Sequence, residues 1–304
     1  MEKVIINSTT MEKVISYLFS RIAAGTLFRF LNLSDLKKTI IAAKNELFSK
    51  SEDRITTKII IDHLLNTSIL HKVNTSYTKN GTPFFYLGFK NEIDLIQPAE
   101  ILHSINKEGV LCFFSAFEIY ELTTQYAPYY HIAEQKNIFK DSTNHTIQPN
   151  IKIKRKTRRD ILGTKEIVYN EIPYYLTRRN KQNILSVKYV DIRGTKIKIV
   201  SIEQCLIDCF LYDEKSGGIN IITEVWENAI NLFNSNTMFE ILKKMNKNSL
   251  NRKIGFYFDY LNFKPSIILT EYLQRFTNSA GDPIQLINES EFIRKNNKWN
   301  ILGP

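Results

Sequence analysis

Residues 33–88 read LSDLKKTIIAAKNELFSKSEDRITTKIIIDHLLNTSILHKVNTSYTKNGTPFFYLG, and this stretch decides the fold of the N-terminal part of the chain. Its beginning predicts an amphipathic helix over residues 34–49, because apolar side chains recur every three or four positions. Ser34 stands at the N-cap position, and Asp35 lies in the first turn, where the helix dipole favours a negative charge. The apolar face of this helix consists of Leu36, Ile40, Ala43 and Leu47.

The remainder of the stretch predicts a second helix followed by a hairpin. The helix covers residues 56–67 and has one apolar face. Residues 71–77 alternate weakly and lead to Asn80-Gly81, a dipeptide that accepts positive φ in a tight hairpin turn, before residues 83–87 return. The apolar face of the second helix consists of Ile60, Ile61, Leu64 and Leu65.

The order helix, helix, hairpin is that of a winged helix-turn-helix. A basic winged helix most often binds duplex DNA, so we expect residues 1–90 to form a DNA-binding domain. The alternative is a small helical domain, capped by a hairpin, that binds nothing.

The distribution of charge favours the first interpretation. The chain of 304 residues has a net charge of +10, and residues 1–90 contribute 13 Lys/Arg against 7 Asp/Glu, or +6. Residues 91–195 contribute +3 (15 against 12), and residues 196–304 contribute +1 (13 against 12). A positive excess in the segment with the winged-helix pattern is expected of a surface that meets phosphates. An Asn/Lys/Ile-rich composition that makes most surfaces basic would also account for it.

The second helix is the candidate for reading bases. Asn66 can make a bidentate contact to adenine, and His63 can donate to a guanine acceptor, whereas Asp62 is unfavourable near phosphates. The helix carries little positive charge, so cations elsewhere would have to contact phosphates. Each candidate, taken singly, could equally be a solvated surface residue. The full set of predicted DNA-binding residues is Lys37, Lys38, Arg54, Thr56, Lys58, His63, Asn66, Lys72, Lys79 and Asn80.

A second basic run is the densest charge in the chain. It is either a second nucleic-acid patch or the solvated side of an edge strand whose Ile151 and Ile153 face inward. Arg178, Arg179 and Lys181 would join this patch if the fold brings them close. The run consists of Lys152, Lys154, Arg155, Lys156, Arg158 and Arg159.

The three cysteines are too few for a disulfide framework. Cys205 and Cys209 lie four residues apart on an apolar helix face, which indicates buried thiols rather than a metal site. No apolar run approaches the ~18 residues that span a bilayer, and the N-terminus lacks an apolar signal-peptide region. We therefore expect a cytoplasmic protein that does not bind membranes.

The rest of the chain predicts an α+β domain over residues 97–304, with strands first and helices afterwards. A helix over residues 11–23, ended by Gly25, precedes the winged helix, and residues 91–98 are a connector. Capping boxes are expected for Ser201 with Gln204 and for Thr237 with Glu240. Strands are predicted at residues 129–134, 151–156, 167–175, 184–190 and 196–201, and helices from residue 113 and at residues 201–212, 221–233, 237–245, 250–261 and 269–277.

No catalytic motif is found, and we expect a non-enzyme without metal or cofactor. A working nucleotidyltransferase needs Gly-Ser and a pair of downstream aspartates that hold Mg²⁺. Lys215-Ser216-Gly217-Gly218 has the reverse order and no acidic pair downstream. Four neighbouring acidic residues are more consistent with cap and surface roles than with a metal site; they are Glu203, Asp208, Asp213 and Glu214.

Several fragments, in the right order, resemble the AbiEi family of type IV antitoxins and defence-linked transcriptional regulators. The match is degraded where Glu121 replaces the usual Gly, and where Ile202-Glu203-Gln204-Cys205 replaces Pro-Glu-Arg-Thr. Together the fragments span most of the chain. They are GTLFRF (25–30), GTPFFYL (81–87), FSAFEIYELT (114–123), RGTKIKIVSIEQCLID (193–208), GGI (217–219), NRKIGFYFDYL (251–261) and KWN (298–300).

The resemblance implies an antitoxin of an abortive-infection system with two parts. The N-terminal winged helix would bind inverted repeats in its own promoter and repress transcription. The C-terminal domain, resembling a degenerate nucleotidyltransferase fold, would counteract a nucleotidyltransferase toxin without a stable complex. The alternatives are a non-catalytic accessory subunit and a plain transcriptional regulator of a phage-defence system.

Overall fold

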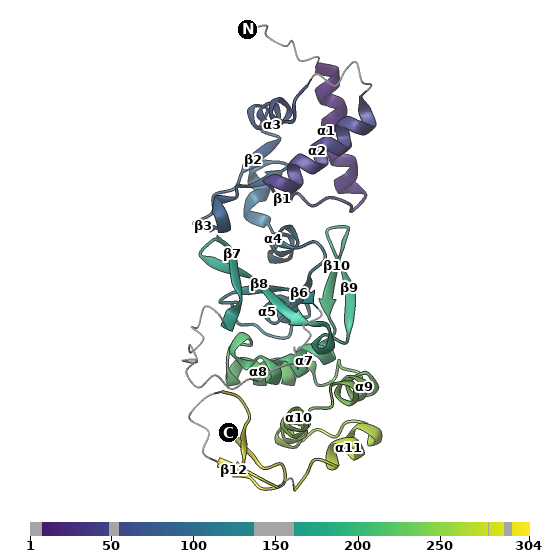
Figure 1. The fold of residues 1–304 in the computed structure, drawn as a ribbon, viewed down its shortest axis with the longest axis vertical. Coiled ribbons are helices and arrows are strands. Elements are labelled where there is room, and N and C mark those ends of the chain that lie inside the picture. The colour runs from purple at the N-terminus through teal and green to yellow at the C-terminus, as the bar shows by residue number, and fades with distance from the viewer. Residues whose placement is uncertain (1–7, 49–54, 137–160, 279, 289–293) are drawn as a thin grey trace, which may run out of the picture. The chain divides into compact units, whose positions relative to one another are not determined.

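The structure, a computed structural model, describes residues 8–48, 55–136, 161–278, 280–288 and 294–304 (Figure 1). It combines helices with several sheets, so the expected α+β class is confirmed. The chain divides into two compact units, each built from segments far apart in the sequence. Unit 1 comprises Met1–Glu108, Lys165–Tyr174 and Tyr189–Ile197, and unit 2 comprises Gly109–Thr164, Tyr175–Lys188 and Lys198–Pro304.

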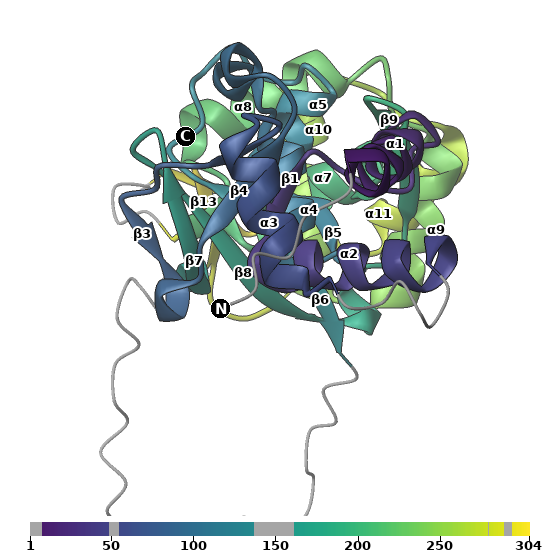
Figure 2. The ribbon, with the colours of Figure 1, turned by 90° about the horizontal axis from the view of Figure 1, so that it is seen from above.

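Unit 1 begins with three helices, α1 (Ser8–Ala23), α2 (Leu33–Leu47) and α3 (Thr57–Asn66). The helix α2 packs against both α1 and α3 (Figure 2). The three predicted helices are therefore confirmed, and their apolar faces meet in one core. That core includes Val14, Leu18, Leu36, Ile40, Ile60, Ile61 and Leu64.

The ends of these helices are set by local chemistry. Gly25, at φ +66°, follows α1 as predicted, and the backbone N–H of Thr26 donates to the Arg21 carbonyl. The predicted Ser34 cap of α2 is wrong. The cap is Asn32, whose side-chain oxygen accepts from the backbone N–H of Asp35 at 2.9 Å.

The hairpin after α3 is more complex than predicted. Residues 71–77 do not form one strand that pairs across the turn. Instead β2 (Leu70–Lys72) pairs with β4 (Phe84–Leu87), and β3 (Tyr77–Thr78) pairs with β7 (Thr164–Tyr169), in both cases antiparallel. The separation occurs because the backbone N–H of Ser76 donates to the Val168 carbonyl rather than to β4.

The chain does reverse at the predicted Asn80-Gly81 turn, where φ is +58° and +65°. The short strand β1 (Phe30–Asn32) pairs with the other edge of β4, which gives a three-stranded antiparallel sheet in the order β1–β4–β2. Unit 1 thus combines α1–α3 with a small antiparallel sheet.

Other parts of unit 1 differ from expectation. A helix α4 (Pro98–Ile105), which packs on β1, follows the expected connector, and the sequence analysis missed it. The single strand predicted at residues 167–175 is two strands, β7 and β8 (Ile172–Asn180), because Asn170 and Glu171 adopt positive φ and reverse the chain. The predicted turn at Arg193-Gly194 joins β9 (Val187–Ile192) to β10 (Thr195–Val200).

In unit 2, the central strand is β5 (Val110–Cys112). It pairs antiparallel with β6 (Tyr130–Lys136) and parallel with the C-terminal part of β10. The chain passes from β5 into α5 (Phe114–Ile119) through Phe113, which is buried and has φ +56°. The strand predicted at residues 151–156 lies outside the described residues.

The helical part of unit 2 follows the sequence prediction. The helices are α7 (Ile202–Leu211), α8 (Ile219–Ala229), α9 (Ser235–Met245), α10 (Asn248–Tyr260) and α11 (Ile267–Gln274). α7 packs against α8, α9 and α10. A C-terminal sheet in the order β11–β13–β12 was not predicted; its strands are β11 (Ile284–Gln285), β12 (Arg294–Asn296) and β13 (Ile301–Gly303).

The two predicted capping boxes are only partly correct. The hydroxyl of Ser201 accepts from the backbone N–H of Gln204 at 3.3 Å, but the Gln204 side chain makes other hydrogen bonds. The predicted cap of α9 by Thr237 is wrong, because Asn234 accepts from the backbone N–H of Thr237. Asn234 is the N-cap because it lies one residue before the helix begins, whereas Thr237 lies within the first turn.

Candidate nucleic-acid interface

The exposed face of α3 is the centre of the candidate interface. Lys58, Asp62 and Asn66 are exposed, and their spacing of four residues places them on one face of the helix. The buried Ile60, Ile61 and Leu64 occupy the other side, as their spacing predicted. Nothing in the described part of unit 1 forms an ion pair or a side-chain hydrogen bond with the side chains of that exposed face.

His63 of α3 and its N-cap residue Thr56, both predicted to bind DNA, have different environments. His63 is half-buried, so only part of its ring is open to solvent. Thr56 is exposed, but its hydroxyl caps α3 by accepting from the backbone N–H of Ile59 at 3.3 Å. The hydroxyl proton remains available as a donor.

Three of the predicted phosphate-binding cations are exposed and form no ion pair with a described residue. Lys37 and Lys38 lie on α2, and Lys72 lies at the end of β2. Among the described residues none of these three ammonium groups forms an ion pair. They are therefore free to contact phosphates.

Lys79, also among the predicted DNA-binding residues, is not an unpaired cation. Its ammonium group lies 2.8 Å from the Glu166 carboxylate on β7, so it is already paired within unit 1. The neighbouring Asn80 is exposed at the tip of the turn. The remaining predicted DNA-binding residue, Arg54, lies outside the described residues.

The structure adds two residues to this region that the sequence analysis missed. Lys165 places its ammonium group 4.6 Å from the centre of the Tyr77 ring, and 40% of Tyr77 is exposed. Lys165 is close to Tyr77 only because β7 pairs with β3. An exposed aromatic ring beside a cation is suited to contact a sugar-phosphate backbone.

The second basic run, Lys152–Arg159, lies outside the described residues. The suggestion that Arg178, Arg179 and Lys181 form one surface patch is wrong for Arg179, which is buried in unit 2. Arg178 is exposed and lies 3.5 Å from the Glu134 carboxylate.

Arg179 belongs to a buried ion pair with Asp208 of α7. Two guanidinium nitrogens donate to the two carboxylate oxygens at 2.6 Å, and both side chains are fully buried. Burial alone would lower the pKa of Arg179, but the Asp208 carboxylate outweighs burial and raises it, so the guanidinium stays charged. The rings of Phe113 and Tyr212 lie 5.4 and 4.7 Å from the guanidinium carbon.

The surface role predicted for the acidic residues of this region is therefore wrong for three of them. Glu203, Asp208 and Asp213 are buried, and each accepts a hydrogen bond from a polar partner. Only Glu214 is exposed. The three cysteines are free and buried, as predicted for Cys205 and Cys209.

Within the described ranges, no group of three or more His, Cys, Asp or Glu side chains is arranged to hold a metal ion. The helices seen in those same ranges are all too short or too polar to cross a membrane.

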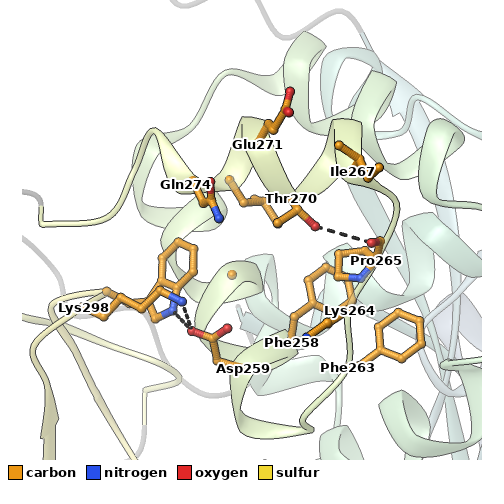
Figure 3. A pocket seen from close by; sticks show the side chains of 13 residues that line it. Phe258, Asp259, Phe263, Lys264, Pro265, Ile267, Thr270, Glu271, Gln274 and Lys298 are labelled. Carbon is orange, nitrogen blue, oxygen red and sulfur yellow. Dashed lines mark hydrogen bonds and ion pairs between the residues drawn. The ribbon is translucent and has the colours of Figure 1, made fainter.

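A cavity of about 600 Å³ lies between α10, α11 and the segment before β13 in unit 2 (Figure 3). Two of its four charged side chains pair with each other. The Lys298 ammonium lies 2.7 Å from the Asp259 carboxylate, which also accepts from the Trp299 indole at 2.6 Å. Ile267, at the rim, is 76% exposed. Lys264, Glu271 and Gln274 also line the cavity, and their exposed side chains mix both charges, so its lining favours no single class of ligand.

Comparison with known proteins supports the fold alone. No protein-family model matches the chain, and no curated protein matches it. Among solved structures, the chain is similar to the crystal structure of the RV2827C protein from Mycobacterium tuberculosis, with 11% sequence identity and a TM-score of 0.52. The similarity covers 96% of this chain and 90% of that chain, so the two share an overall fold.

Proposed function

We propose that the protein is a DNA-binding transcriptional regulator that contacts duplex DNA through α3 and the cations of unit 1. The observation that carries this proposal is the exposed face of α3, whose polar side chains have no partner among the described residues of unit 1. The order α2, α3 and then a β-sheet that contains a reversing turn agrees with a winged helix-turn-helix.

In this proposal the residues have two distinct roles. Asn66 is the base-reading residue, because an exposed amide on the outer face of a helix can bond both N6 and N7 of adenine. Lys37, Lys38 and Lys72 contact phosphates, which contributes affinity without sequence preference. The Lys165–Tyr77 pair is a further backbone contact at the edge of the same unit.

The different roles of Asn66 and Lys72 predict different losses of DNA affinity when each is replaced by alanine. Asn66→Ala should weaken binding to operator DNA by roughly 1–3 kcal/mol and leave binding to random duplex unchanged. Lys72→Ala should weaken binding to both DNAs about equally, because phosphates are common to all sequences. Fluorescence anisotropy of the two duplexes, titrated with the full chain, measures both affinities.

The matched controls for this experiment lie in unit 2. Asn220→Ala on α8 and Lys188→Ala on β9 remove the same chemical groups from exposed positions there. Equal losses on operator and random DNA for Asn66→Ala would show that α3 is not the reading helix.

We further propose that the protein acts as an antitoxin against a nucleotidyltransferase toxin, which rests on the sequence resemblance to the AbiEi family. If α3 and its cations serve repression only, a variant in which Lys37, Lys38 and Lys72 are all alanine should lose repression but still protect cells. Co-expression with the neighbouring toxin gene, scored by growth and by a promoter reporter, measures both. Protection without repression supports an antitoxin with separate functions. Repression by the wild type without any protection would leave a plain regulator.

A further inference from the structure

Lys215, in the turn after α7, is a buried cation without a counter-charge among the described residues. Its side chain is 6% exposed, and its ammonium group donates to the Thr177 hydroxyl at 2.9 Å. No carboxylate oxygen of the described residues lies within ion-pair distance of it. Buried charges in proteins are normally paired, so this arrangement requires an explanation.

The groups that surround Lys215 do not supply the missing charge. The Asp208 carboxylate is already held by two nitrogens of Arg179 and by the Gln204 amide. Glu214 is the adjacent residue, but its side chain is exposed and forms no ion pair with the ammonium. On the other side the ammonium lies 5.5 Å from the centre of the Phe113 ring and 5.4 Å from that of Tyr212, and neither ring carries a negative charge.

Lys215 lines a cavity of about 480 Å³ within unit 2. Its other polar lining consists of the hydroxyl groups of Thr164, Thr177 and Tyr212, the exposed Arg178 and the exposed Glu214 carboxylate. The cavity wall is closely packed at Gly163. This glycine adopts φ +110°, and a Cβ there would lie 2.8 Å from the Leu176 carbonyl oxygen. The cavity thus presents two cations and three hydroxyl groups against one carboxylate, that of Glu214, which is exposed.

We propose that this cavity binds the phosphate group of a small phosphorylated ligand, with the Lys215 ammonium as its counter-charge. Two N–H donors of that ammonium have no acceptor among the described residues, and phosphate oxygens would accept from them. The threonine hydroxyls supply further donors at the same cavity, as do the guanidinium nitrogens of Arg178 other than Nε, which lies 3.5 Å from the Glu134 carboxylate. This site lies in unit 2 and is independent of the DNA-binding proposal for unit 1.

The pH dependence of binding follows from the same geometry. Burial lowers the pKa of Lys215, while Cys112, Glu214 and Asp208 oppose this and Arg179 adds to it. Without an anion, Lys215 loses its proton at a lower pH than an ordinary lysine. Phosphate binds only the charged form, so its affinity is highest near neutral pH and begins to fall at a pH below the ordinary lysine pKa of about 10.4.

The test is calorimetric titration of the full chain with inorganic phosphate, a nucleoside 5′-monophosphate and the unphosphorylated nucleoside. We expect the first two to bind wild type and the nucleoside not to bind. Lys215→Met should raise the phosphate Kd about 10- to 100-fold, as expected for loss of a charge-assisted hydrogen bond. Lys181→Met, which removes an exposed cation outside the cavity, should leave the Kd unchanged.

The outcomes separate clearly. Tighter binding of the monophosphate than of inorganic phosphate supports a nucleotide ligand, and equal binding supports recognition of the phosphate group alone. If Lys215→Met does not fold, Lys215→Gln and the pH series of the wild type provide the same comparison. Phosphate binding that is absent, or unaffected by loss of the Lys215 charge, overturns the proposal.

Discussion

Replacing Arg179 with methionine is expected to lower the free energy of unfolding of unit 2 by about 3–5 kcal/mol. The change removes the partner of Asp208, a fully buried carboxylate whose one other bond to a described residue is with the Gln204 amide. Burial raises the pKa of Asp208 and the Arg179 guanidinium opposes that rise, so loss of Arg179 leaves the carboxylate to take up a proton or remain unpaired. Chemical denaturation of the full chain, followed by tryptophan fluorescence, measures the loss, because Trp226 and Trp299 both lie in unit 2.

The matched control removes both charges at once. In the double variant Arg179→Met with Asp208→Leu, no buried charge is left unpaired, so most of the lost stability should return. The double-mutant cycle then gives the coupling between the two side chains. A loss below about 1 kcal/mol for Arg179→Met alone would mean that the pair is solvated in the folded protein.

Replacing Lys37, Lys38 and Lys72 with alanine together is expected to weaken binding to any duplex DNA by about 100- to 1000-fold near 0.1 M salt. Each ammonium group that contacts a phosphate releases about 0.9 counterion, so the slope of log K against log salt should become less steep by about 3. The three side chains are exposed and have no ion pair among the described residues, so their removal should not destabilise the fold. Anisotropy titrations at several salt concentrations measure both effects.

A triple variant of unit 2 provides the control. Lys188, Lys243 and Lys264 are exposed there, and replacing all three with alanine changes the net charge of the protein by the same amount. If this control loses as much affinity as the unit 1 variant, the binding depends on net charge and not on a defined surface.

Local patterns in the sequence were sufficient to predict much of unit 1. The spacing of Ile60, Ile61 and Leu64 predicted which face of α3 is buried, and Asn80-Gly81 predicted the place where the chain reverses. The apolar face around Cys205 and Cys209 similarly predicted buried thiols. In each case the deciding interactions are between residues close in the sequence.

The errors concern partners that are distant in the sequence. The ion pair of Lys79 was not predicted, because its partner Glu166 lies 87 residues away and is brought close by the β3–β7 pairing. Asp208 was assigned to the surface, since aspartate is rarely buried without a partner and its partner Arg179 lies 29 residues earlier. Lys215 was not predicted to be a binding residue, because its burial depends on how the turn after α7 packs against distant residues.

The central claim is that unit 1 binds duplex DNA, and the most direct test is binding of the full wild-type chain to the DNA upstream of its own operon. The full chain is required because unit 1 includes Lys165–Tyr174 and Tyr189–Ile197 as well as the N-terminal residues. We predict binding that is tighter than to random duplex and that falls with salt, with a slope of log K against log salt of about −3 to −5. No binding to either duplex at about 50 mM salt, by a protein shown to be folded, would contradict the claim.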